Sequence, residues 1–464
     1  MVFSGLTFLL LFLPTLLILY FLSRDLRWRN GVLVVFSLVF YAWGEPVMVL
    51  LLLATTLFNY LVALAMDKAP GPRGKKLCLI LGVAGSLAGL LYFKYAGFFL
   101  SNLSRLLGAE IPFAAPRLPI GISFYTFQIL TYTVDVYRGK TAVQKSFFRL
   151  LLYVSCFPQL IAGPIVQYAD VAAALEERTA SLEDFGDGMR RFLLGLGKKV
   201  LLANTCGSFL LAVLPAGTTP QSVGGAWLSG ALYSLQLYFD FSAYSDMAIG
   251  LGRVLGFTYK ENFNYPYCSA SPTDFWRRWH ISLGSFFRDY VYIPLGGSRR
   301  GKGRRMLNLL IVWALTGLWH GAAWNFVLWG LYWFLLLVID KDLDRLWQKV
   351  PRFLRWLSTL VAAVVGWTIF YYTDTAALFA HLSALFGGGL PWTDPTTSSA
   401  LRQYALFLPL VCLAAAPMVP RLKKLAEDRP ALAVLGTVFA VAVGLLSLLF
   451  LIRQSYNPFI YFRF

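Results

Sequence analysis

The sequence from 307 to 339 reads LNLLIVWALTGLWHGAAWNFVLWGLYWFLLLVI, and it contains two apolar runs separated by a histidine and a glycine. The runs cover 307–319 and 322–339, and neither contains a charged residue. Uninterrupted apolar segments of about this length are typical of helices that lie in a membrane. This stretch therefore predicts a membrane-embedded helical hairpin with its tip at His320-Gly321-Ala322-Ala323.

Similar apolar runs recur along the whole chain. They cover 5–22, 31–43, 47–66, 77–93, 119–134, 147–166, 191–214, 224–239, 307–319, 322–339, 356–372, 404–420 and 432–452. Of the 464 residues, 58% are hydrophobic and 14% are charged, whereas soluble domains carry about 25% charged residues. We therefore predict one all-α polytopic membrane domain over 1–464, with about ten to thirteen membrane helices, some of them short, re-entrant or horizontal.

The net charge of +18 is one that nucleic-acid-binding proteins also show. In this chain, however, Lys and Arg gather in short segments between apolar runs, so we expect no nucleic-acid partner. The basic segments 24–29, 67–76 and 138–149 alternate with 44–46 and 94–118, which carry few charges. Under the positive-inside rule, this alternation places the basic loops in the cytoplasm and both termini outside.

The cysteines indicate neither a metal site nor a disulfide framework. The chain has five of them, and they are far apart, with no CxxC pair and no Cys/His cluster. We therefore expect no bound metal.

The hairpin suggests a depth for its tip. Its two arms join the basic segments 296–305 and 341–355, which the charge pattern places in the cytoplasm. The first arm, 307–319, would be about 20 Å long at a rise of 1.5 Å per residue, which is shorter than a hydrocarbon core of about 30 Å. The tip is therefore predicted to lie within the membrane, away from either surface.

His320, at this tip, is the first candidate for chemistry. An ionisable side chain at bilayer depth is costly, and such residues usually serve a function. A neutral imidazole can accept a proton near pH 7. The alternative is a structural histidine that forms hydrogen bonds between helices.

His280 lies in the segment 271–282, SPTDFWRRWHIS. Ser271 as N-cap and Pro272 at the first position predict the start of a partly buried helix that lines a cavity. Helical spacing would put four residues on one face of it: Trp276, His280, Leu283 and Phe287. Direct chemistry and a role in shaping the site are both open for His280. The third histidine, His381, falls in the segment 373–403, predicted to be an outer loop, and receives no role.

A cationic run follows in the sequence. Its members are Arg299, Arg300, Lys302, Arg304 and Arg305. The run could hold the phosphates of coenzyme A at the cytoplasmic side. A topological anchor is the alternative, and we favour it from the sequence.

Two carboxylates, Asp240 and Asp246, lie in a mostly apolar region. Because they are six residues apart on a predicted helix, they point in different directions and do not form a carboxylate pair. We expect each to bond a neighbouring helix or a backbone group.

Several motifs together resemble those of the membrane-bound O-acyltransferase (MBOAT) superfamily, and they occur in the same order as in that family. They are GISFYTFQ (121–128), FPQLIAGPI (157–165), LYFDFSAYSDMA (237–248), NFNYPY (262–267), FWRRWHIS (275–282) and LWHG (318–321). The similarity is greater to the bacterial branch of alginate and peptidoglycan O-acetylation proteins. It covers about residues 1–340 strongly and the remainder more loosely.

This resemblance implies that His320 is the catalytic histidine and that His280 is the second important one. It also implies a central funnel with acetyl-CoA as the donor substrate on the cytoplasmic side of the cell inner membrane, and no bound cofactor. An SGNH-type, Ser-His-Asp hydrolase-like partner outside the membrane would pass the acetyl group to an extracellular or periplasmic polysaccharide, alginate or peptidoglycan-like.

The last six residues, FIYFRF at 459–464, carry a second resemblance. They are similar to the aromatic C-terminal motif of the small partner peptide in the D-alanylation of teichoic acids. There the tyrosine is thought to hold the acyl group in transit, which implies Tyr461 as an acyl acceptor. A phenol can accept an acyl group if a base removes its proton. An interfacial aromatic anchor is the alternative, and both readings are open.

Two other functions remain to be weighed. One is D-alanyl transfer to teichoic acid. The presence of the C-terminal motif in this same chain argues against it. The other is a non-enzymatic transporter or flippase, which Gly- and Pro-broken helices and intramembrane polar groups would fit. No two matching halves are visible in the sequence, so we favour the enzyme.

Overall fold

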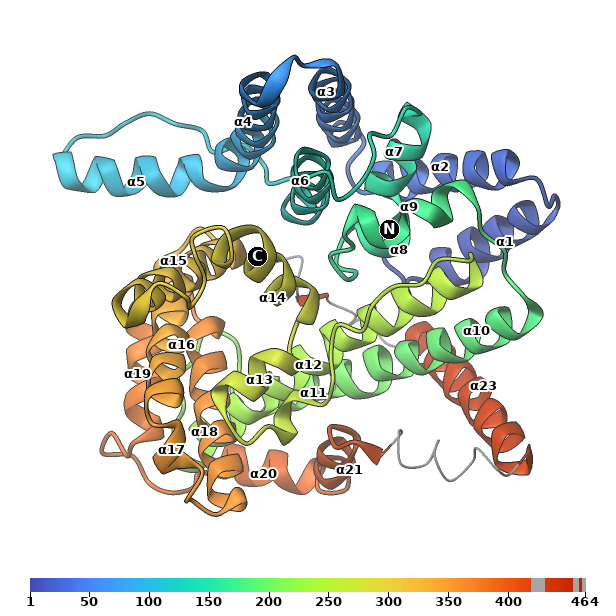
Figure 1. The fold of residues 1–464 in the computed structure, drawn as a ribbon. Coiled ribbons are helices and arrows are strands. Elements are labelled where there is room, and N and C mark those ends of the chain that lie inside the picture. Colours follow the sequence, from blue (N-terminus) through green and yellow to red (C-terminus); the bar gives the residue numbers. More distant parts are fainter. Residues whose placement is uncertain (419–429, 454–458, 461–464) are drawn as a thin grey trace. The chain divides into compact units, whose positions relative to one another are not determined.

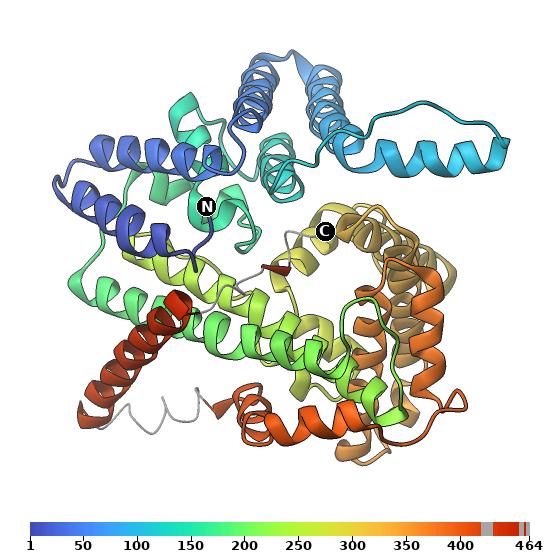
Figure 2. The same cartoon turned by 180° about the vertical axis from the view of Figure 1, so that it is seen from behind.

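The computed structural model describes residues 1–418, 430–453 and 459–460. All regular secondary structure in these ranges is helical. Figures 1 and 2 show the helices from opposite sides. The chain divides into two compact units, one made of 1–192 and 244–260, the other of 193–243 and 261–464. Two long helices, α10 (Leu182–Gly197) and α12 (Val223–Val254), contribute residues to both units. The predicted all-α fold is confirmed, and the single domain over 1–464 stays a prediction.

Six segments of the described chain are long and apolar enough to cross a membrane. They are Met48–Lys68, Gly71–Leu107, Leu182–Val213, Trp324–Asp342, Arg352–Tyr371 and Ala431–Arg453. Large apolar side chains on them face outward: Phe439, for example, is 62% exposed. The chain is therefore a multi-pass membrane protein. A shorter apolar helix at Phe8–Phe21 accounts for the predicted run 5–22, and another, Thr375–Leu385, lies in the segment 373–403 that was predicted to be a loop.

The first unit is built mainly from the N-terminal helices. They are α1 (Leu13–Phe21), α2 (Leu26–Ala42), α3 (Met48–Lys68), α4 (Gly71–Leu90), α5 (Ala96–Leu107), α6 (Ile122–Tyr137), α7 (Phe147–Ser155), α8 (Phe157–Leu160) and α9 (Tyr168–Glu176). Buried polar groups join three of these helices. The Asn59 side chain on α3 bonds Ser86 on α4 at 2.9 Å and accepts from the Thr133 hydroxyl on α6 at 2.9 Å. Such interhelical hydrogen bonds are typical of helices packed in lipid, where apolar contact alone gives little preference for a neighbour.

The second unit holds the remaining helices. They are α11 (Asn204–Val213), α13 (Pro272–Arg278), α14 (Ile281–Phe287), α15 (Gly301–His320), α16 (Trp324–Asp342), α17 (Asp344–Trp347), α18 (Arg352–Tyr371), α19 (Thr375–Leu385), α20 (Pro395–Gln403), α21 (Phe407–Ala414) and α23 (Pro430–Arg453). Their core is rich in aromatic rings, with Trp329, Trp333 and Trp367 almost fully buried. Phe275 of α13 stacks on Trp333 of α16 with ring centres 5.4 Å apart. Large rigid rings of this kind fix the positions of the surrounding helices.

The predicted hairpin is present as α15 and α16, which pack along each other (Figure 1). Close approach depends on two glycines, because a Cβ at Gly317 would overlap the Phe326 carbonyl oxygen and one at Gly330 would overlap that of Trp313. The predicted length of the first arm is wrong. The helix begins at Gly301 and has 20 residues, so it is about 30 Å long. The helix includes basic residues that precede 307. The length of α15 alone therefore does not place the hairpin tip inside the hydrocarbon core.

Candidate functional site

His320 is the last residue of α15, and its side chain lies among aromatic rings. Only 5% of the residue is exposed. Its ring centre lies 5.0 Å from that of Trp329 on α16 and 5.1 Å from that of Phe370 on α18. At the following residue, Gly321, a Cβ would overlap the Phe326 ring, so the turn requires a glycine there. Three helices therefore fix the His320 imidazole in one place.

The segment around His280 differs from its prediction. The helix starts as expected, because the Ser271 hydroxyl accepts a hydrogen bond from the Asp274 N–H at 3.2 Å. It ends at Arg278, however, and a new helix, α14, begins at Ile281. The prediction that Trp276, His280, Leu283 and Phe287 share one helical face is therefore wrong.

The break is stabilised by the loop 262–264. The Asn264 N–H donates to the Arg278 carbonyl at 2.9 Å, and the Ile281 N–H donates to the Asn262 carbonyl at 2.9 Å. His280 itself has φ +45°, in the left-handed region. In the described ranges, the non-glycine residues with positive φ are His280 and Tyr265. Such a conformation is costly for a bulky residue and is concentrated at functional sites.

The hydrogen bonds of Asn262 determine which nitrogen of the neutral His280 ring carries the proton. The Asn262 side-chain oxygen accepts from the Ser282 N–H at 3.1 Å and from the Ser282 hydroxyl at 2.9 Å. Because this atom is an acceptor, His280 Nδ1 at 3.2 Å from it must carry the proton and donate. The other nitrogen, Nε2, then presents a lone pair, and it has no hydrogen-bond partner among the described residues.

Burial keeps this ring neutral. His280 is 1% exposed, and loss of hydration lowers its pKa to about 3. A neutral imidazole with an open lone pair can accept a hydrogen bond or a proton from a group brought to it. The side chain therefore combines a fixed tautomer with an open hydrogen-bond acceptor at Nε2, and its lowered pKa makes this nitrogen a weak base.

The structure brings the two predicted histidines to the same tryptophan. The Trp319 ring centre lies 5.8 Å from that of His280 and 4.9 Å from that of His320. Phe241 of α12 also packs against His280, with ring centres 4.7 Å apart. All of these residues belong to the second unit. Two imidazoles in one aromatic, water-poor environment form a site suited to moving a proton between bound groups.

The cationic run does not meet the histidines. It lies at the start of α15, and His320 is the last residue of that helix. Asp342 on α16 compensates two of its charges, at 2.8 Å from Lys302 and 2.6 Å from Arg305. The side chains of Arg299, Arg300 and Arg304 are exposed, so their positive charge is directed to the surroundings of the protein.

The expectation for the two carboxylates is confirmed. Asp246 forms an ion pair with Arg191 at 2.8 Å. Asp240 pairs with Lys199 at 2.6 Å and accepts a hydrogen bond from the Ile460 backbone N–H at 2.8 Å. The sequence analysis missed Lys199, although a lysine within the apolar run 191–214 is a usable signal of a buried charge.

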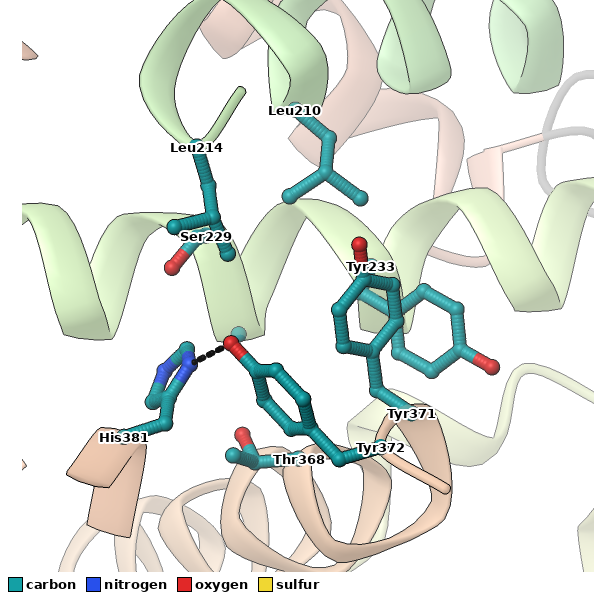
Figure 3. Close-up of a pocket in the computed structure, with 9 residues that line it drawn as sticks. Leu210, Leu214, Ser229, Tyr233, Thr368, Tyr371, Tyr372 and His381 are labelled. Carbon is teal, nitrogen blue, oxygen red and sulfur yellow. Dashed lines mark hydrogen bonds between the residues drawn. The ribbon is translucent and has the colours of Figure 1, made fainter. Parts of the chain in front are cut away.

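His381 lies in a helix rather than in the predicted loop. It is part of α19 and is 2% exposed, so the prediction of a loop at this position is wrong. Figure 3 shows a small pocket beside it, lined by residues at or near the ends of α11 and α18 and within α12 and α19. His381 Nε2 donates to the Ala226 carbonyl at 3.0 Å, and Nδ1 accepts from the Tyr372 hydroxyl at 2.8 Å. Both nitrogens are therefore engaged, as in a histidine that joins helices.

The C-terminal motif is described only in part. Phe459 and Ile460 lie within the described residues, and Ile460 is 8% exposed. The predicted acyl acceptor, Tyr461, lies outside them, together with the rest of the motif to Phe464.

Comparisons with known proteins agree with the motifs. The profile of the family described as MBOAT, membrane-bound O-acyltransferase family, matches residues 124–380, a range that contains His280 and His320. A probable alginate O-acetylase of Azotobacter vinelandii is 40% identical, and one of Pseudomonas putida is 39% identical; each alignment covers 100% of both chains. A peptidoglycan O-acetyltransferase of Helicobacter pylori is 33% identical over 82% of this chain and 79% of its own length.

Proposed function

Because the chain belongs to the membrane-bound O-acyltransferase family, we propose that this O-acyltransferase moves acetyl groups across the membrane for O-acetylation of a polysaccharide. The relatives named for alginate and for peptidoglycan favour an extracellular or periplasmic glycan as the final acceptor. The observation that carries the proposal is the placement of two buried imidazoles, His280 and His320, around one tryptophan ring.

The reaction is acyl transfer from a thioester to a hydroxyl. His320 removes the proton of the acceptor hydroxyl as its oxygen attacks the acetyl carbonyl carbon. The new C–O bond forms, the C–S bond breaks, and the proton passes to the sulfur of the leaving thiol. His280, which is neutral and presents Nε2, orients a reacting group or assists this proton movement.

Acetyl-CoA is the proposed donor, approaching from the cytoplasm. The exposed side chains of Arg299, Arg300 and Arg304 offer charge for the phosphates of coenzyme A. Lys302 and Arg305 lie next to these side chains in the sequence and form ion pairs with Asp342. The donor is a substrate, and the proposal requires no bound cofactor.

Tyr461 is the proposed intermediate acceptor. With the charge pattern placing both termini outside the cell membrane, an acetylated phenol on the tail would be presented to the outer side. An SGNH-type partner there would transfer the acetyl group to the polysaccharide. The tail is part of the same chain, which favours acetyl transfer of this kind over D-alanyl transfer.

Tyr461→Phe tests this relay. The substitution removes the hydroxyl and retains the ring, so polysaccharide acetylation in cells is expected to be lost while the amount of protein in the membrane is unchanged. Tyr456→Phe, which removes a hydroxyl five positions earlier in the tail, is the matched control and is expected to retain acetylation. Full acetylation in the Tyr461→Phe strain would contradict the relay.

A further inference from the structure

Lys199 and Asp240 form an ion pair enclosed within the second unit. Lys199 Nζ lies 2.6 Å from Asp240 Oδ1, and each side chain is only 3% exposed. Removing two charges from water is costly, and apolar residues of the same size often stabilise a protein as well or better. Stability alone therefore does not account for this pair, and its remaining contacts become informative.

Two of these contacts are to residues near the end of the chain. The second carboxylate oxygen of Asp240, Oδ2, accepts a hydrogen bond from the Ile460 backbone N–H at 2.8 Å. The Lys199 ammonium lies 5.8 Å from the centre of the Phe459 ring, within reach of a cation–π interaction. Figure 2 draws 459–460 as a short red ribbon, and the hydrogen bond places it beside α12. The ion pair therefore contacts both described residues of the C-terminal motif.

The side chain of Ile460 adds an apolar contact. It belongs to the same buried cluster as Tyr238 and Phe239, the two residues that precede Asp240 on α12. The tail is thus held by its backbone through a charged acceptor and by its side chain through the core. A hydrogen bond to a charged group is stronger than one between neutral groups, especially where water is excluded.

Two elements bring Lys199 and the tail together. Lys199 lies in η3 (Lys198–Ala203), a π-helical turn between α10 and α11. Such turns are frequent at functional sites because they change the direction of side chains within a helix. The final helix, α23, packs against η3, and a Cβ at Gly197 would overlap the Val443 side chain of α23.

We propose that the Lys199–Asp240 pair is a docking site for the chain's own C-terminal segment, with Asp240 as the positioning residue for the backbone at Ile460. Lys199 holds the Asp240 carboxylate through Oδ1 and leaves Oδ2 for the tail. Tyr461 follows Ile460 directly in the sequence. That docking matters for acetyl transfer rests on the proposed function. The docking of the tail does not depend on the proposed function.

The first test removes only the donor of the docking hydrogen bond. Proline has no backbone N–H, so Ile460→Pro leaves Asp240 Oδ2 without this partner while the Lys199–Asp240 pair is untouched. Ile460→Val is the matched control, because valine retains the N–H and a branched apolar side chain.

The second test separates docking from a structural role of the ion pair. The double variant Lys199→Asp/Asp240→Lys keeps two opposite charges in contact but places a donor where the tail requires an acceptor. A purely structural pair would be restored by this exchange. A docking site would be lost, because a lysine ammonium cannot accept the Ile460 N–H.

Docking can be measured by treating the purified full-length protein with a carboxypeptidase and following the intact mass. Release of residues 462–464, which breaks no bond to residue 460, is expected to be about tenfold to a hundredfold faster in Ile460→Pro and in the exchanged pair than in the unaltered chain or Ile460→Val, consistent with loss of a charge-assisted hydrogen bond. Thermal unfolding of each variant verifies that the fold is retained. Equal digestion rates for Ile460→Pro and Ile460→Val would overturn the proposal.

Acetyl transfer measured on the same variants separates this proposal from the proposed function. Loss of both protection and acetyl transfer in Ile460→Pro is the expected result. Loss of protection with unchanged acetyl transfer would support docking and contradict the acetyl relay through Tyr461.

Discussion

At the scale of single residues, the account depends on how His280 is held. Asn262 fixes its Nδ1 proton, and the left-handed backbone directs the ring into the aromatic site beside Trp319. A local sequence pattern could identify the residue but not this geometry. The reason is that Asn262 lies 18 residues earlier in the chain, and the tautomer follows from its contacts with Ser282.

The lowered pKa of His280 predicts a specific dependence of stability on pH. The unfolded chain binds a proton near pH 6.5, whereas the folded chain does so only near pH 3, because burial lowers the pKa. Stability is therefore fully present above about pH 6.5 and decreases as the pH falls toward 3, by about 1.4 kcal/mol per pH unit.

His280→Asn removes this titration while asparagine tolerates a positive φ. Between pH 6.5 and pH 5, the loss of unfolding free energy in detergent micelles is expected to be smaller in His280→Asn by about 2 kcal/mol. Denaturant titrations at the two pH values measure it. An equal loss in both proteins would show that His280 does not stay neutral in the fold.

At the scale of elements, the hairpin of α15 and α16 positions His320. Its existence was predictable, because two apolar runs flank a short break at 320–321. The start of α13 was predictable for a similar local reason, since Ser271 caps its own helix. The end of α13 was not, because the loop 262–264 supplies the bonds that break the helix.

Gly317→Ala tests the role of close packing in the hairpin. The added methyl group would overlap the Phe326 carbonyl oxygen, so the two helices must separate or shift, at a cost of about 1–3 kcal/mol. Because His320 is three residues further along the same helix, acetyl transfer is expected to fall along with the unfolding temperature.

Gly303→Ala is the control for helix propensity. It lies on the same helix, and a Cβ there meets nothing within 4 Å, so it is expected to leave the unfolding temperature unchanged or raise it slightly. Similar behaviour of the two alanine variants would show that the glycine contact does not hold the hairpin together.

At the scale of the whole molecule, composition and apolar patterning were sufficient for the all-α, multi-pass class. Contacts between residues far apart in the chain could not be predicted from composition or apolar patterning. Asp240 and Ile460 are 220 residues apart, and no local pattern relates them. The proposed docking site therefore follows only from the contacts among α12, η3 and residues 459–460, although the motifs at 237–248 and 459–464 can each be recognised in the sequence.

The central claim is that His320 is the base in acetyl transfer by this chain. The most direct measurement incubates the purified full-length protein in lipid nanodiscs with radiolabelled acetyl-CoA and follows transfer of the label from the thioester. The unaltered chain is expected to transfer it, and His320→Ala, at equal amount and with the same unfolding temperature, is expected to be slower by a factor of about 100 to 10,000. Transfer at an unchanged rate in His320→Ala would contradict the account.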